Sequence, residues 1–281
     1  KTLGKIRTSE TYATTLCSFR RFREDRDVVL DDMDSDMMMA YEAYLRNNGV
    51  SPNSSSFYMR NLRAVYNRAV EKGLTSQRFP FKHVYTGVDK TVKRAVPLKV
   101  IKKIKEMDFS MNPTFDFARD MFLISFYTRG MSFVDMAYLR KKDLQNGVLS
   151  YRRRKTGQQL FIKWEKCMQE IVEKYDTSQS NYLLPIIKPF SEIDERKQYI
   201  YAAHNINRCL KIIGKELGLS VSLTLYVARH AWASIAKSKN VPLSVISEGM
   251  GHDSEATTRI YLASLDTMAI DKANSMILKS L

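Results

Sequence analysis

The last third of the sequence carries, in order, an arginine, a histidine and a tyrosine that together could act on a phosphodiester. Arg229 precedes His252 by 23 residues, and Tyr261 follows His252 by 9. An arginine can hold two phosphate oxygens through its planar guanidinium, and a histidine exchanges protons near neutral pH. A tyrosine hydroxyl can form a covalent bond to phosphorus, which divides one difficult step into two easier ones. This order of residues predicts phosphodiester chemistry that uses no metal and no other cofactor.

The charge of the chain favours a polyanionic partner. The 281 residues include 45 Lys and Arg against 30 Asp and Glu, a formal net charge of +15 at pH 7. Much of the excess lies in residues 91–105, with six basic and no acidic side chains, and in residues 140–166, with nine basic and two acidic ones. Charge gathered in two short blocks suggests contact with nucleic-acid phosphates, and a basic surface that is merely solvated is the alternative.

The cysteines and the hydropathy narrow the class of protein further. Cys17, Cys167 and Cys209 are scattered, odd in number and without a C-x-x-C pair. This argues against a disulfide scaffold or a zinc knuckle and suits a reducing compartment. No apolar run reaches the length of a membrane span. We therefore expect a cytoplasmic protein that has no membrane partner.

Helices are expected throughout the first ninety residues. Apolar spacing predicts helices from Ser9 to Arg26, from Ser35 to Asn47, and from Pro52 to just before Gly73. Arg60 and Arg63 fall among the exposed positions of the third helix. They are candidate DNA contacts, with a solvated helix face as the alternative.

A linker and a second domain are expected next. Residues 86–97 are rich in charge and poor in large apolar groups, which is typical of a linker, and they contain two further candidate DNA contacts, Lys93 and Arg94. A buried helix is predicted from Asp116 to Tyr127, and a β-hairpin across residues 147–164 with a polar loop from Arg152 to Gln159. Shorter helices are predicted after Pro97 and at Glu165–Tyr175, Ala202–Leu217, Leu225–Lys239, Leu243–Gly249 and Glu255–Leu262.

Four motifs carry the polar residues of this second domain. They are TRGMSFVDMAYL around Arg129, RRRKTGQ around Lys155, LYVARHAW around Arg229, and EGMGHDSEATTRIY with His252 and Tyr261. Each of these residue types is common by itself, so the order of the four motifs is what makes the pattern specific. In this order the motifs resemble those of the tyrosine recombinases, the phage integrase family, and in particular the integrases of phages and conjugative transposons. The resemblance covers nearly the whole chain.

The resemblance implies a mainly helical α+β fold with a small β-sheet. Residues 1–90 would form the family's SAM-like core-binding domain, residues 91–97 a linker, and residues 98–281 the catalytic domain. The tail from Ser264 to Leu281 carries an apolar stripe that is typical of a short amphipathic helix. It packs either on its own domain or, as in the family, on a neighbouring protomer.

The resemblance also implies roles for single residues. Tyr261 is expected to be the nucleophile, while Arg129 and Arg229 would stabilise the pentacoordinate phosphate. Lys155 would protonate the departing 5′-oxygen, with plain phosphate contact as its alternative. His252 would bind the phosphate or assist proton transfer. Further DNA contacts are expected from the basic residues beside the lysine, Arg152, Arg153 and Arg154.

Two positions depart from the family pattern. Tyr226 stands where the family commonly has a histidine, three residues before Arg229, and a tyrosine is a poor general base at neutral pH. Asp135 occupies the acidic position that braces the active site, but it lies six residues after Arg129, where the family usually has three. A plain helix-start carboxylate is the alternative for Asp135.

The resemblance implies a site-specific recombinase, an integrase, that cuts and rejoins double-stranded DNA through a 3′-phosphotyrosyl intermediate and a Holliday junction. The expected assembly is a tetramer on paired DNA sites, formed from monomers or weak oligomers, with accessory DNA-bending proteins as further candidate partners. One alternative is a DNA invertase with the same chemistry. Another is an architectural DNA-binding protein whose catalytic site has decayed.

Overall fold

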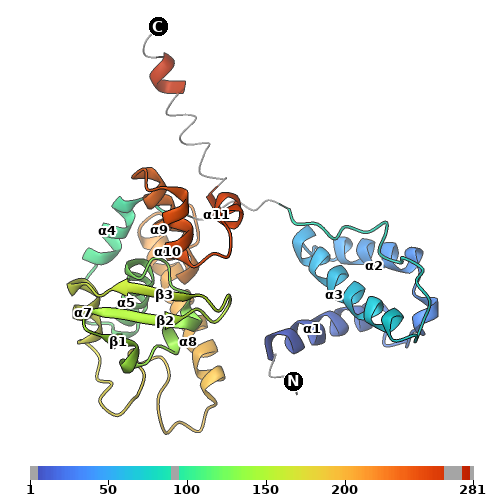
Figure 1. Ribbon diagram of the computed structural model, residues 1–281, viewed down its shortest axis with the longest axis horizontal. Coiled ribbons are helices and arrows are strands. Elements are labelled where there is room, and N and C mark those ends of the chain that lie inside the picture. Colours follow the sequence, from blue (N-terminus) through green and yellow to red (C-terminus); the bar gives the residue numbers. More distant parts are fainter. Residues whose placement is uncertain (1–5, 90–94, 263–273, 279–281) are drawn as a thin grey trace. The chain divides into compact units, whose positions relative to one another are not determined.

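The computed structural model divides the chain into two compact units, residues 1–91 and 92–281. It describes residues 6–89, 95–262 and 274–278, apart from the side chains of Ile260 and Tyr261. Helices make up most of both units, and the second unit also holds a three-stranded sheet (Figure 1). The predicted α+β fold class is therefore confirmed.

The first unit is built on three helices: α1 (Ile6–Phe22), α2 (Ser35–Asn47) and α3 (Pro52–Glu71). Side-chain caps begin the second and third of them, since Asp34 accepts a hydrogen bond from the Met37 amide and Ser51 one from the Ser54 amide. The predicted start of α2 and α3 is confirmed. α1 ends at Phe22, earlier than predicted, because Glu24 and Asp25 adopt left-handed backbone conformations that a helix does not permit.

The core of the second unit forms around α5 (Pro113–Tyr127), the apolar helix expected from the sequence. It packs against α8 (Glu195–Glu216) and α9 (Leu225–Ser238), and also against the shorter α4 (Leu98–Glu106) and α7 (Lys166–Val172). A helix enclosed on several sides must be apolar around most of its circumference, which explains why α5 shows little amphipathic periodicity.

The sheet is antiparallel, in the order β1 (Leu144–Gln145), β2 (Val148–Arg152), β3 (Gln159–Lys163). Alternate side chains of β2 and β3 are buried, and the buried Tyr151 pairs in register with the buried Leu160. The predicted hairpin is confirmed. Its loop is slightly shorter than expected, because Arg152 and Gln159 still pair as the last residues of their strands.

The other helices of this unit differ in how well the sequence predicted them. α10 (Leu243–Met250) and α11 (Glu255–Leu262) lie where the sequence predicted them. α6 (Phe133–Ala137) was not predicted. α8 begins earlier than expected, at Glu195, because the Asp194 side chain accepts hydrogen bonds from the Arg196 and Lys197 amides.

Several predictions fall on residues that the structure does not describe. Lys93 and Arg94 lie outside the described residues, together with part of the expected linker. Most of the expected tail helix also lies outside them, although residues 274–278 are helical. Among the described helices, none combines the length and the apolar character that crossing a membrane requires.

Candidate functional site

Arg229 lies at the centre of the candidate site and connects three segments of the second unit. It projects from α9 and is only 5% exposed. Its Nη1 donates to the carbonyl oxygen of Gly130 at 2.7 Å, and its Nη2 donates to the carbonyl oxygen of Met250 at 2.8 Å. Nη2 also lies 2.9 Å from Nε2 of His252. These contacts orient the guanidinium before any phosphate arrives.

His252 is held in one tautomer by its two neighbours. An arginine can only donate, so the Nε2 atom that faces Arg229 must accept. Nδ1 therefore carries the hydrogen and donates to Oγ1 of the fully buried Thr258, 2.7 Å away. Burial, as the largest cause, and the positive charges of Arg229, Arg153 and Lys155 together lower the pKa of His252 to about 4. The imidazole is therefore neutral at neutral pH.

Arg129 is placed by an abrupt end to α5. Arg129 and Gly130 both adopt left-handed conformations, with φ of 61° and 76°. A Cβ atom on Gly130 would lie 2.6 Å from the Cα atom of Arg229, so only glycine fits against α9 here. The Arg129 side chain is half-buried, and its Cδ lies 3.5 Å from where a Cβ on Gly249 of α10 would be. The structure thus brings both predicted arginines to one place.

Lys155 occupies the turn of the β2–β3 hairpin and is exposed. The turn is fastened to α6, because the Arg154 amide donates to Oδ1 of Asp135 at 2.9 Å. Asp135 is buried and accepts a second hydrogen bond from the Ser132 hydroxyl at 2.6 Å. Asp135 lies in the first turn of α6, so it is a helix-start carboxylate that also holds the hairpin. The charge of Lys155 reaches His252, whose pKa it helps to lower.

Tyr226 lies on α9 one turn before His230, and the two rings meet edge to face with centroids 4.6 Å apart. The tyrosine is 59% exposed. It lines a small pocket of about 180 Å³ together with Gly130, Ser132 and Arg229. Tyr226 and Arg229 therefore line the same pocket, and Tyr226 is the more exposed of the two.

Tyr261 lies near the end of α11, and its side chain is outside the described part of the structure. The helix itself is held in the site by Thr258, whose hydroxyl bonds to His252. Because Thr258 precedes Tyr261 by three residues, it lies nearly one helical turn before the expected nucleophile. The backbone of Tyr261 is thus within about a turn of the residue that orients His252.

The three consecutive arginines of the hairpin have different environments. Arg152 and Arg154 are exposed, and the guanidinium carbon of Arg154 lies 3.8 Å from the centroid of the Tyr138 ring. Arg153 is buried, 7% exposed, and donates to the carbonyl oxygen of Gly251. Arg152 and Arg154 remain exposed, although Arg152 also donates to the carbonyl oxygen of Gly157 at 3.1 Å, whereas Arg153 is engaged inside the protein.

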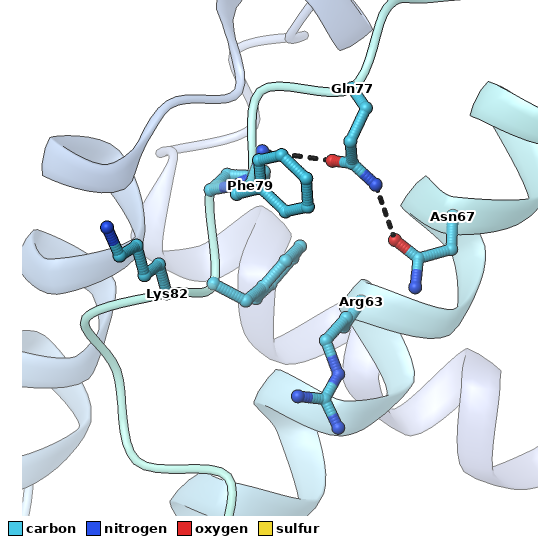
Figure 2. A pocket seen from close by; sticks show the side chains of 7 residues that line it. Arg63, Asn67, Gln77, Phe79 and Lys82 are labelled. Atoms are coloured by element: carbon cyan, nitrogen blue, oxygen red, sulfur yellow. Dashed lines mark hydrogen bonds between the residues drawn. The ribbon is translucent and has the colours of Figure 1, made fainter.

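The candidate DNA contacts of the first unit lie on α3. Arg60 is exposed, while Arg63 is half-buried and donates to the Thr86 hydroxyl at 3.2 Å. Arg63 also lines a pocket of about 530 Å³ (Figure 2). In this pocket Gln77 accepts from the Phe79 amide and donates to the Asn67 side chain. Arg60 is thus the more accessible of the two cations.

The residues that support the expected catalytic ones were not predicted from the sequence. Thr258 and Gln158 were not singled out, although Gln158 donates to the carbonyl oxygen of His252 at 3.1 Å. A partial signal exists for Thr258, since side chains three residues apart share one face of a helix and Tyr261 is three residues on. For Gln158 no comparable signal exists, because its contact depends on how the hairpin meets the loop after α10.

Sequence models of two protein families match the chain. Residues 1–84 match the phage integrase SAM-like domain, and residues 99–268 match the phage integrase family. The second match alone covers more than half of the chain.

The chain belongs to the phage integrase family.

Two relatives within this family are the tyrosine recombinases XerA of two archaea. That of Thermococcus kodakarensis is 24% identical over 244 residues, which is 82% of this chain and 77% of the relative. That of Pyrococcus furiosus is 24% identical over 229 residues, 79% of this chain and 74% of the relative. The family resemblance drawn from the motifs is confirmed, and the protein is an enzyme, a tyrosine-type site-specific recombinase.

Solved structures of integrases and recombinases share the fold. The post-cleavage complex of the XerH site-specific recombinase bound to a palindromic difH substrate has a TM-score of 0.71 at 17% identity, covering 95% of this chain and 78% of the XerH chain. A lambda integrase dimer bound to a COC′ core site has a TM-score of 0.68 at 16% identity, covering 92% of this chain and 88% of the integrase chain. These likenesses show that the fold is shared.

Proposed function

We propose that this recombinase cuts and rejoins double-stranded DNA through a covalent 3′-phosphotyrosyl intermediate formed at Tyr261. The observation that carries the proposal is the hydrogen-bonded series from Arg229 through His252 to Thr258. It connects a buried phosphate-binding group to the helix that bears Tyr261.

In the first step the phenol oxygen of Tyr261 attacks the scissile phosphorus while the bond from phosphorus to the 5′-oxygen breaks. Arg129 and Arg229 stabilise the negative charge that builds on the phosphate oxygens. Tyr226 donates a hydrogen bond to one of these oxygens from its accessible position. The pKa of His252 is lowered to about 4, so its imidazole is a weak base at pH 7. A tyrosine hydroxyl at position 226 is also a poor general base, and the phenol proton of Tyr261 passes to water.

The leaving 5′-oxygen takes its proton from the ammonium of Lys155, which is exposed at the hairpin turn. The released 5′-hydroxyl then attacks the phosphotyrosyl bond of a partner strand and frees the tyrosine. Because the energy of the broken phosphodiester is kept in the phosphotyrosyl bond, the exchange consumes no ATP. Two such exchanges in sequence create and resolve a Holliday junction.

A tetramer on two paired DNA sites is the assembly that this chemistry needs, with one active tyrosine for each strand. A lambda integrase tetramer bound to a Holliday junction shares the fold, with a TM-score of 0.69 at 16% identity, and covers 92% of this chain and 72% of its own. The net charge of +15 supports a DNA partner. We place its action at the DNA of the bacterial nucleoid.

The test is a nicked suicide substrate that carries the recombination site, located beforehand by footprinting. The short strand beyond the nick diffuses away after cleavage, so the covalent adduct accumulates and survives denaturation. We expect an adduct with the wild type and none with Tyr261→Phe, while both proteins bind the DNA. Binding without an adduct in the wild type would instead support the architectural alternative.

A further inference from the structure

Arg153 is a buried cation that the phosphotransfer steps above do not use. Its guanidinium donates to the carbonyl oxygen of Gly251, the residue before His252. Removing an arginine from water is costly unless partners inside the protein compensate. A side chain held in this way supports the fold around it and is not free to follow a DNA backbone.

A second side chain of the hairpin makes a parallel contact. Gln158 Nε2 donates to the carbonyl oxygen of His252 at 3.1 Å. Arg153 and Gln158 are themselves joined across the turn, because the Arg153 amide donates to the Gln158 carbonyl oxygen at 2.8 Å. The two residues that close the Lys155 turn therefore each hold one carbonyl of the Gly251–His252 segment.

The packing at Gly251 shows how closely the hairpin approaches. Gly251 ends α10 in a left-handed conformation, with φ of 63°. A Cβ atom there would lie 3.0 Å from Leu160, 3.1 Å from Gln158 and 3.2 Å from Cδ of Arg153. The hairpin is seated directly on the backbone that precedes His252.

The opposite side of the turn is fixed as well. The Arg154 amide donates to Asp135, so the turn is held between α6 and the loop after α10. Lys155 lies at the centre of this arrangement, and its own side chain remains exposed. The position of the Lys155 backbone is thus set by contacts that Lys155 does not make itself.

We propose that Arg153 is a positioning residue that fixes the Lys155 turn on the Gly251–His252 segment, so that Lys155 and His252 address the same phosphate. This inference rests on the proposed function for the role of Lys155. It assigns Arg153 a task different from that of its exposed neighbours Arg152 and Arg154. Loss of Arg153 would act on the protonation of the leaving group and would leave DNA binding largely intact.

The test uses DNA in which sulfur replaces the 5′-bridging oxygen at the scissile phosphate. A thiol has a pKa of about 8.5, so a thiolate leaves without a proton donor, whereas an alkoxide does not. Cleavage is measured in single turnover with saturating protein. We expect Lys155→Ala to lose roughly 100–10,000-fold on ordinary DNA, the usual contribution of a proton donor. It should regain most of this on the sulfur-containing DNA.

Arg153→Gln should behave in the same way, with a loss on the order of 10-fold or more on ordinary DNA and recovery on the sulfur-containing DNA, because a misplaced donor forfeits part of that contribution. Arg119→Gln is the matched control, since Arg119 is also largely buried but is paired with Asp116 and Asp120. Any loss that it causes should be equal on the two DNAs. The proposal is overturned by an Arg153 variant that is as fast as wild type on ordinary DNA, or by one that is equally slow on both DNAs while Lys155→Ala is rescued by sulfur.

A second measurement does not depend on activity. Limited trypsin digestion of the native protein reports whether the turn is held, because Arg154 and Lys155 are cleavage sites within it. We expect Arg153→Gln to be cut there several-fold faster than wild type, and Arg153→Lys to be intermediate. Unchanged digestion would contradict the positioning role. If Lys155→Ala is not rescued by sulfur while the Arg153 variants are cut faster, the proton-donor assignment fails and the positioning contact stands.

Discussion

At the scale of single residues, the site is organised by groups that are already bonded before DNA binds. The Arg229 guanidinium is fixed by two carbonyl oxygens, and His252 is fixed between Arg229 and Thr258. Charge that is oriented in advance stabilises a transition state without the cost of reorganisation. Substitution of the residues that orient Arg229 and His252 should therefore also lower the rate of DNA cleavage.

Thr258 provides the direct test of this point. Thr258→Val keeps the shape of the side chain but removes the acceptor for Nδ1 of His252, and a buried donor without a partner costs about 1–3 kcal/mol. We expect the rate of adduct formation to fall roughly 10-fold, and Thr258→Ser to restore most of it. Equal rates for the valine and serine variants would show that the hydroxyl does not orient His252.

The pKa of His252 predicts how stability depends on pH. In the folded protein this pKa is lowered from the ordinary 6.5 to about 4, so below pH 6.5 the unfolded chain takes up the proton first. The contribution of His252 is complete above pH 6.5 and declines as the pH falls toward 4. Urea unfolding at pH 7, 5.5 and 4.5 should show a smaller decline for His252→Gln than for wild type. A decline of the same size in both proteins would contradict the pKa assignment.

At the scale of elements, the ends of helices place the reactive groups. Two consecutive left-handed residues, Arg129 and Gly130, follow the end of α5. They turn the chain so that Gly130 lies against α9 and its carbonyl oxygen accepts from Arg229. The β2–β3 hairpin bridges α6 and the loop after α10. The site is thus formed where the ends of several helices and the hairpin meet. Small changes in backbone conformation there should lower the stability of the fold.

Gly130→Ala tests this close approach. The left-handed conformation alone costs a non-glycine residue about 1–2 kcal/mol, and the contact with Arg229 should add about 1–3 kcal/mol of overpacking. Gly218→Ala is the matched control, because Gly218 follows α8 with φ of 66° and a Cβ there would meet nothing within 4 Å. We expect urea unfolding to show the larger loss of stability for Gly130→Ala. Equal losses would mean that the approach to α9 is unimportant.

At the scale of the whole molecule, two units with separate cores carry basic candidate contacts: Arg60 on α3 of the first, and Arg152 and Arg154 on the hairpin of the second. Each phosphate contact releases bound counterions, so the logarithm of the DNA affinity should fall linearly with the logarithm of the salt concentration. If both units bind DNA in the full chain, removing a cation from either should flatten this dependence.

We therefore expect Arg60→Gln and Arg152→Gln, each made in the chain of both units, to lower the slope by about one unit. Arg26→Gln is the surface control, since Arg26 is already paired with Glu24 at 2.7 Å, and it should leave the slope unchanged. Fluorescence anisotropy titrations measure this slope. They are made between about 50 and 200 mM salt, the range in which protein–DNA binding weakens strongly. A slope that does not respond to Arg60→Gln would argue against contact through α3.

Much of the fold could be predicted because local patterns determine it. α2 and α11 have the predicted bounds, and the hairpin forms where apolar residues flank a polar turn. α6 escaped prediction because five residues are too few to show a helical period. Residues 195–201, about the first two turns of α8, escaped prediction because the helix start depends on the cap at Asp194, which the apolar repeat does not indicate.

The sequence by itself determined the family and the reacting residue types, because the order of the four motifs is a property of the chain. Only the tertiary structure separated Arg153 from Arg152 and Arg154, which are the same residue type in one unbroken run. Alternation along a strand says that neighbours face opposite sides, but which side is buried depends on what packs against the hairpin. Here that is the Gly251–His252 segment, about a hundred residues away in the chain. Contacts between segments so distant are made by the fold, and local sequence does not encode them.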